Sequence, residues 1–313
     1  MSAAPEPRQA RSCLAWIFLS PGERRLRAGW RLLAQFCLLV ICYLVFGGLV
    51  GALLNLAPAS PSLLFYGEVT ATLAVTLSVF VARRLFDRRS ILSLGLSFDR
   101  QALFDLVAGI CLPGLMLGLV YGAEVALGWL KFEGFAGGLN SVGSLWVQAA
   151  GGLFFFVLVG WQEELLTRGY WLQNLADGLH LTWGVLLSSL AFAAAHGFNP
   201  NASWIAVVSL VCDGLFLAFG YLRTRRLWLP VGLHVGWNFF EGIVYGFPVS
   251  GIGGLFHLIR QTATGPELWT GGAFGPEAGL IQLPAVALGA LLILWYTSRR
   301  KESTNVVGNR SEH

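Results

Sequence analysis

The chain has 313 residues, of which 55% are hydrophobic and only 12% are Asp, Glu, Lys or Arg, and its formal net charge is +4. Its mean hydropathy is +0.64. A soluble globular domain carries about 25% charged residues, so this composition excludes an ordinary soluble domain and indicates a protein that lies largely in lipid.

The first 31 residues form a polar, basic segment whose only apolar run is residues 14–19. That run is too short for the apolar region of a secretory signal peptide, so we interpret residues 1–31 as a basic cytoplasmic or interfacial segment. The five cysteines show neither a disulfide framework nor a metal-binding spacing.

Eight apolar stretches follow, each close to the roughly 20 residues that cross a bilayer as a helix. The predicted spans are 32–54, 64–81, 103–130, 145–166, 181–198, 204–222, 227–247 and 280–296. The sequence therefore predicts an all-α, polytopic membrane helix bundle of about eight transmembrane helices within residues 32–298, followed by a polar tail at 299–313.

The basic residues orient this bundle. With the N-terminus in the cytoplasm, all but two of the 21 Lys and Arg fall in cytoplasmic segments, and only Lys131 and Arg260 lie outside. Because Lys and Arg concentrate in cytoplasmic loops, we expect both termini to be cytoplasmic. The short loops favour a multi-pass protein of a bacterial cell (inner) membrane.

A first polar island lies in the fourth predicted span. Glu164 and Arg168 are four residues apart, so on a helix they share a face and can pair, whereas Glu163 points about 100° away. Ionisable side chains in a membrane span are costly and usually functional, so Glu163 is a candidate general base. The alternative is a charge cluster that snorkels to the cytoplasmic end of the span.

Two further islands lie in the fifth and seventh predicted spans. Phe192 precedes His196 by one helical turn, and His234 precedes Asn238 by one turn. An imidazole suits acid–base chemistry, and a carboxamide can stabilise an oxyanion. Each side chain could instead serve packing only, through interhelical hydrogen bonds of about 0.6 kcal/mol.

In order and spacing, the three islands resemble the EExxxR, FxxxH and HxxxN motifs of the CAAX-protease and bacteriocin-processing (CPBP, or Abi) family of intramembrane proteases. The motifs stand here as Glu163-Glu164-Leu165-Leu166-Thr167-Arg168, Phe192-Ala193-Ala194-Ala195-His196 and His234-Val235-Gly236-Trp237-Asn238. The resemblance covers about residues 145–247.

The resemblance implies an endopeptidase that acts on a membrane-anchored, lipidated or prenylated protein or peptide, and no nucleic-acid partner. Glu163 would activate water, with His196 assisting. His234 and Asn238 would stabilise the oxyanion, and the Glu164–Arg168 pair would orient the site. Members described as zinc proteases suggest a metal bound by His196, His234 and Glu163. Because an amide is a poor zinc ligand, we expect no cofactor and keep zinc as the alternative.

Two other functions fit a membrane bundle with buried charges: a non-catalytic immunity or partner-binding protein, and a proton-coupled transporter. A transporter typically shows an internal repeat, and none is visible in this sequence. Further acids fall in or near the predicted spans, and their roles stay open: Glu68, Asp105, Glu124, Asp213 and Glu241. Of these, Glu241 shares the helix face of His234 and is the best candidate to line the site.

The depth of the site residues poses a geometric problem. Glu163 lies near the predicted cytoplasmic end of its span, whereas His196 lies about 22 Å into its own span at about 1.5 Å per residue. These residues can meet only if the fifth span is strongly tilted, starts below the membrane plane, or is fed by an interfacial helix at residues 170–180.

Overall fold

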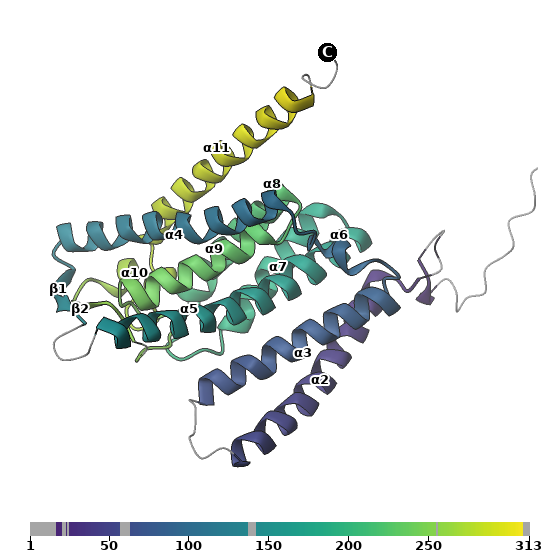
Figure 1. Cartoon of the computed structure of the whole chain (residues 1–313), viewed down its shortest axis with the longest axis horizontal. Coiled ribbons are helices and arrows are strands. Elements are labelled where there is room, and N and C mark those ends of the chain that lie inside the picture. Colours follow the sequence, from purple (N-terminus) through teal and green to yellow (C-terminus); the bar gives the residue numbers. More distant parts are fainter. Residues whose placement is uncertain are drawn as a thin grey trace, which may run out of the picture.

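The computed structural model of the chain describes residues 17–20, 23, 25–56, 63–136, 142–254 and 256–308. This part is mostly helical (Figure 1), and five of its helices are long and apolar enough to cross a membrane. The chain is thus a helical membrane protein with five candidate spans. The count of eight spans and the cytoplasmic position of both termini stay predictions.

Eight long helices carry most of the chain. In chain order they are α2 (Ala28–Leu56), α3 (Leu63–Leu85), α4 (Arg100–Ala126), α5 (Val142–Glu164), α7 (Leu181–His196), α8 (Trp204–Thr224), α9 (Trp228–Asn238) and α11 (Gln282–Gly308). α5 continues through a π-helical segment, Leu165–Trp171, into α6 (Leu172–Gly178), and α9 continues through a second π-helical segment, Phe239–Val244. Short turns complete the chain: Ile91–Leu94, α10 (Glu267–Thr270) and Pro276–Ala278.

A small β-sheet makes the all-α prediction incomplete. β1 (Leu130–Phe135) pairs antiparallel with β2 (Ile259–Ala263), and the register breaks between Phe132 and Gly134. β1 follows α4 directly, and β2 falls in the Gly-rich segment that links α9 to α11. The sheet therefore lies outside the predicted spans and joins two segments far apart in the sequence.

The helices form a central group with two arms (Figure 1). α4, α9, α5 and α7 lie together in the middle, the α2–α3 pair diverges on one side, and α11 leans away on the other. α9 approaches α4 closely because glycines face each other: a Cβ at Gly109 would lie 2.6 Å from the carbonyl oxygen of Leu229 and 2.8 Å from the Cα of Gly232. Small residues four apart, here Gly232 and Gly236, are the usual means of close helix packing in membranes.

The helix that carries Glu163 continues well past residue 166, where the predicted span ends. α5, the π-helical segment and α6 form one continuous helical stretch that ends at Gly178, fifteen residues after Glu163. α7 then runs back from Leu181 and reaches His196 fifteen residues after its start. Because the turn between α6 and α7 lies equally far from both residues, Glu163 and His196 reach the same depth without a strong tilt.

Ion pairs hold the α2–α3 arm against this hairpin. Asp87, at the end of α3, accepts hydrogen bonds from Arg83 at 2.8 Å and from the hydroxyl of Tyr170 at 3.1 Å. Asp177 on α6 pairs with Arg31 of α2. Arg31 belongs to α2, which starts at Ala28, and α11 extends to Gly308, within the predicted tail.

Candidate active site

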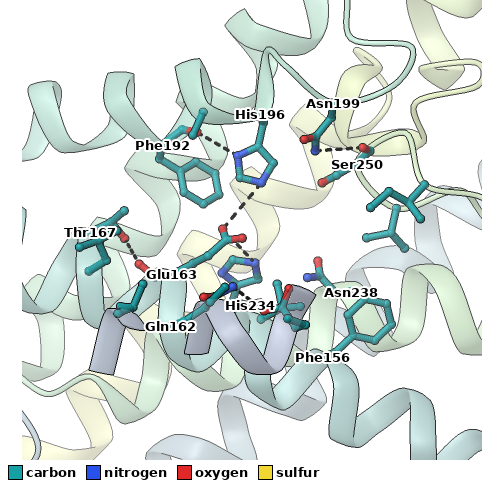
Figure 2. A pocket seen from close by; sticks show the side chains of 18 of the residues that line it. Phe156, Gln162, Glu163, Thr167, Phe192, His196, Asn199, His234, Asn238 and Ser250 are labelled. Atoms are coloured by element: carbon teal, nitrogen blue, oxygen red, sulfur yellow. Dashed lines mark hydrogen bonds and ion pairs between the residues drawn. The ribbon is translucent and has the colours of Figure 1, made fainter. Parts of the chain in front are cut away.

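The three polar islands meet at one cavity of about 390 Å³. Figure 2 shows Glu163 of α5, His196 of α7 and His234 and Asn238 of α9 around this space. The structure therefore brings together all four residues that the sequence predicts to be catalytic.

Glu163 is the central side chain of the group. Its Oε2 lies 3.7 Å from Nε2 of His196 and 3.9 Å from Nε2 of His234. The side chain is 27% exposed, and Oε2 itself is buried and has no hydrogen-bond partner among the described residues. A carboxylate oxygen in this setting is available to accept a proton from water, and two imidazole nitrogens lie within one water molecule's reach.

The hydrogen bonds of the two histidines fix which ring atom faces Glu163. Nδ1 of His196 lies 2.9 Å from the carbonyl oxygen of Phe192, and Nδ1 of His234 lies 3.0 Å from Oε1 of Glu164. A carbonyl or carboxylate oxygen only accepts, so each Nδ1 carries a proton and donates it. Nε2 is therefore the nitrogen of each ring that is available to exchange a proton in the cavity.

Glu164 and Arg168 form a fully buried ion pair behind the site. Arg168 Nη1 donates to Glu164 Oε1 at 2.7 Å and to the Thr167 hydroxyl at 2.8 Å, while Nη2 donates to the carbonyl oxygen of Gly214 at 2.9 Å. The pair thus joins α5, α8 and, through His234, α9. This is the i,i+4 pair expected from the sequence, with Glu163 on a different face.

Phe192 packs between the charged and catalytic groups. Its ring lies 4.6 Å from the His196 ring and 6.0 Å from the His234 ring, and the guanidinium of Arg168 lies 4.7 Å from its centroid. A cation over an aromatic face is attracted by the ring quadrupole. Phe192 therefore holds Arg168 in place and forms one wall of the cavity.

Further polar residues line the cavity without having been predicted as site residues, among them Glu68, Gln162, Asn199 and Ser250. Gln162 donates to the carboxylate of Glu68, which belongs to α3. Asn199, just after α7, donates to the carbonyl oxygen of Ser250 at 3.1 Å (Figure 2). Glu68 carried the signal of an acid in a span, whereas Asn199 and Ser250 lie in turns and gave no signal in the sequence.

The other acidic residues in or near the predicted spans lie in different parts of the structure. Asp105 accepts from Tyr296 at 2.9 Å and belongs to the α4–α11 contact. Asp213 lines a second, smaller cavity. Glu124 and Glu241 are fully buried, and neither lines either cavity as the described residues outline them. The sequence predicted Glu241 as the acid most suited to line the site, and this prediction is wrong. A π-helical segment begins at Phe239, so the residues after Asn238 no longer follow the α-helical spacing that would place Glu241 on the face of His234.

A zinc ion would need His196, His234 and Glu163 as ligands. Within the described residues, no group of three or more His, Cys, Asp or Glu side chains has the arrangement of a metal site. The fourth neighbour, Asn238, adds an amide, which binds zinc poorly, but a catalytic zinc site needs only three protein ligands and a water. The absence of a cofactor therefore stays a prediction, with zinc as the alternative.

A carboxylate, two imidazoles and a carboxamide around one cavity are side-chain types that hydrolytic sites use. Residues 145–240 match the family model of the type II CAAX prenyl endopeptidases, described as Rce1-like. The resemblance to the CPBP proteases is thus confirmed over this segment, which contains all three motifs. No curated protein matches the chain in a sequence search.

Proposed function

We propose that this protein is an intramembrane endopeptidase that hydrolyses a peptide bond of a membrane-anchored or lipidated substrate with water activated by Glu163. The observation that carries the proposal is the position of Glu163 Oε2, which lies within 4 Å of two imidazole nitrogens in one cavity. The match of residues 145–240 to a prenyl endopeptidase family supports it.

The geometry suggests a role for each side chain. Glu163 accepts a proton from water, and the water oxygen attacks the carbonyl carbon of the substrate. The oxyanion that develops accepts hydrogen bonds from the amide of Asn238 and from Nε2–H of His234, whose ring carries a proton on both nitrogens in this role. Donors that are already in place cost no reorganisation. When the carbon–nitrogen bond breaks, the proton held by Glu163 passes to the leaving nitrogen, and His196 assists this transfer.

Glu164 and Arg168 act by orienting His234 rather than by touching the substrate. The carboxylate of Glu164 accepts the Nδ1 proton of His234, so it fixes the ring and stabilises positive charge on it as the oxyanion forms. Arg168 in turn holds that carboxylate in place.

The cavity walls favour a lipidated or membrane-anchored substrate. Apolar side chains from α2, α3 and α5 also line the cavity, among them Leu39, Val75, Phe155, Phe156 and Val159. An aliphatic or isoprenoid chain would bury apolar surface there, while the scissile bond would lie at Glu163. The matched family is named for prenyl endopeptidases, so a prenylated protein or peptide is the proposed substrate class.

The proposed setting is a bacterial cell membrane, with eight spans and both termini in the cytoplasm. The distribution of Lys and Arg supports this orientation. α7, α11 and the combined stretch of α9 and its π-helical extension would supply the three spans beyond the five candidates.

Reconstitution into proteoliposomes tests the function. We expect the wild type to cleave a farnesylated CAAX peptide faster than the same peptide without the lipid, and Glu163→Ala to be inactive while eluting as a folded protein. Equal cleavage by Glu163→Ala would remove Glu163 from the site. Absence of cleavage in the wild type across lipidated and transmembrane substrates would favour a partner-binding or transport role.

Treatment of the enzyme with a zinc chelator distinguishes the metal-free reaction from the zinc-dependent alternative. The metal-free proposal predicts full activity after dialysis against a strong zinc chelator. Loss of activity that returns only on addition of zinc would instead assign His196, His234 and Glu163 as ligands.

A further inference from the structure

A second cavity, of about 40 Å³, adjoins the catalytic cavity. The two cavities share five lining residues, which are Phe192, His196, His234, Asn238 and Ser250. The catalytic imidazoles and the amide of Asn238 therefore form a common wall, with the substrate cavity on one side and the small cavity on the other.

The small cavity is lined by buried acidic side chains. Two acids line it, Asp213 from α8 and Glu277 from the turn before α11. Gln282 joins them, because its Nε2 donates to Oδ2 of Asp213 at 3.3 Å and to the carbonyl oxygen of Glu277 at 2.6 Å. Glu277 is 4% exposed, and its Oε1 has no hydrogen-bond partner in the part of the chain that the structure describes.

A buried carboxyl oxygen of this kind requires a partner, since leaving a buried polar group without a hydrogen bond costs its full desolvation free energy. A metal ion is not favoured, because no group of three or more acidic, His or Cys side chains among the described residues has the arrangement of a metal site. Water fits better. A water needs a volume of at least about 10–15 Å³ by this measure and two to four polar partners, so 40 Å³ accommodates about three waters.

Water in this cavity would lie next to the site where hydrolysis consumes water. Each peptide bond that is hydrolysed consumes one water, whose oxygen joins the new carboxyl group and whose protons are shared between the products. The catalytic cavity is flanked by apolar helices, and a bound substrate displaces solvent from it. Water held behind His196 and His234 can still reach Glu163 when the substrate occupies the front of the site.

We propose that the cavity lined by Asp213 and Glu277 is a water-binding site that supplies the hydrolytic water to Glu163. The supply role rests on the proposed peptidase function, whereas the presence of bound water does not. The two parts are therefore tested by separate measurements on the full-length protein in detergent or proteoliposomes.

Radiolytic hydroxyl labelling tests for the water, because side chains next to bound water are oxidised even when they are buried. Trp237 lines the small cavity but not the large one, and it is only 9% exposed. We expect rapid oxidation of Trp237 and slow oxidation of Tyr170, which is 0% exposed and lines neither cavity. Oxidation of Trp237 as slow as that of Tyr170 would show a dry cavity and overturn the proposal, whatever the enzyme cleaves.

Variants test the supply role. Asp213→Leu should abolish the fast labelling of Trp237 and lower kcat by at least about tenfold with little change in KM, since ordered water is displaced by an apolar group. Asp213→Asn keeps a polar wall, so it should retain the labelling and show a smaller loss of kcat. If Asp213→Leu does not fold, Leu210→Phe fills the same cavity from its apolar wall.

The matched control is Glu124→Gln, which changes a fully buried acid that lines neither cavity. It should leave both the labelling of Trp237 and kcat unchanged. Loss of labelling in a cavity-filling variant that keeps wild-type kcat would show that the water does not feed the reaction and would overturn the supply role. A wild type that labels Trp237 but cleaves nothing would instead refute the peptidase function and leave the water site established.

Discussion

Oε1 of Glu164 lies 2.7 Å from Nη1 of Arg168 and 3.0 Å from Nδ1 of His234. One carboxylate oxygen therefore contacts both a buried guanidinium and an imidazole that lines the cavity. The two adjacent glutamates thus have different settings: Glu164 holds the ion pair and the hydrogen bond to His234, whereas Oε2 of Glu163 has no hydrogen-bond partner among the described residues.

Glu164→Gln should impair both stability and catalysis. The substitution keeps the shape of the side chain but leaves Arg168 buried without a counter-charge, and breaking a buried ion pair costs about 3–5 kcal/mol. We expect a large drop in the unfolding midpoint in detergent and, in the folded fraction, a lower kcat. Glu124→Gln is the control, because Glu124 is as buried but has no hydrogen-bond partner among the described residues. Equal stability of the two variants would contradict the account of the pair.

Asn238→Ala should lower kcat by about 10²–10³-fold with little effect on KM, as expected for the loss of one oxyanion donor. Asn199→Ala is the matched comparison, since Asn199 lines the same cavity but donates to the carbonyl oxygen of Ser250. Steady-state kinetics on a lipidated peptide would measure both. A similar loss in the two variants would mean that Asn238 has no special role in the transition state.

Gly236→Ala should destabilise the contact between α4 and α9. A Cβ at this position would overlap the carbonyl oxygen of Ile110, which is backbone and cannot move aside easily. Forced overpacking costs about 1–3 kcal/mol, and it would shift His234, two residues earlier on α9. Gly122→Ala on α4, where nothing lies within 4 Å of the new Cβ, should be neutral or stabilising. Thermal unfolding followed by tryptophan fluorescence would distinguish the two, and equal midpoints would argue against tight packing here.

The pH dependence of stability should include a term from Asp99, which precedes α4. The hydrogen bond from Arg226, together with that from the backbone N–H of Ala102, lowers the pKa of Asp99 from 3.8 to about 2. Because the pKa in the folded state is below that of the unfolded state, this contribution is complete above about pH 4 and is lost as the pH falls towards about 2.

Asp99→Asn tests this contribution, since Asn still caps the helix but carries no charge. The difference in unfolding midpoint between wild type and variant should be constant from neutral pH to about pH 4 and should shrink below it. A difference that persists unchanged to about pH 2 would show that the pairing of Asp99 with Arg226 does not stabilise the folded state.

The sequence was most informative where polar residues stand out in apolar helices. Spacing alone separated the face of Glu163 from that of Glu164 and Arg168, and the structure shows that pair. The depth of the site could not be predicted, because the charges from Glu163 to Arg168 lower the local hydropathy as the end of a span would. Since Arg168 pairs with Glu164 and donates to Gly214 inside the bundle, the helix can continue to Gly178.

Other features had no local signal at all. Asn199 and Ser250 meet only through the tertiary arrangement of two turns, and β1 pairs with a strand more than a hundred residues away. The change of phase at Glu241 depends on a π-helical segment, which arises from packing rather than from a sequence pattern.

The central claim is that one particular carboxylate of this cavity activates water. Glu163 and Glu68 both line the cavity, but only Glu163 lies beside the two imidazoles. The direct measurement is the single-turnover rate of peptide cleavage in proteoliposomes by Glu163→Gln and by Glu68→Gln. We predict a loss of about 10²–10⁴-fold for Glu163→Gln, the usual contribution of a general base, and a much smaller effect for Glu68→Gln. Cleavage by Glu163→Gln at the wild-type rate, or an equal loss in both variants, would contradict the account.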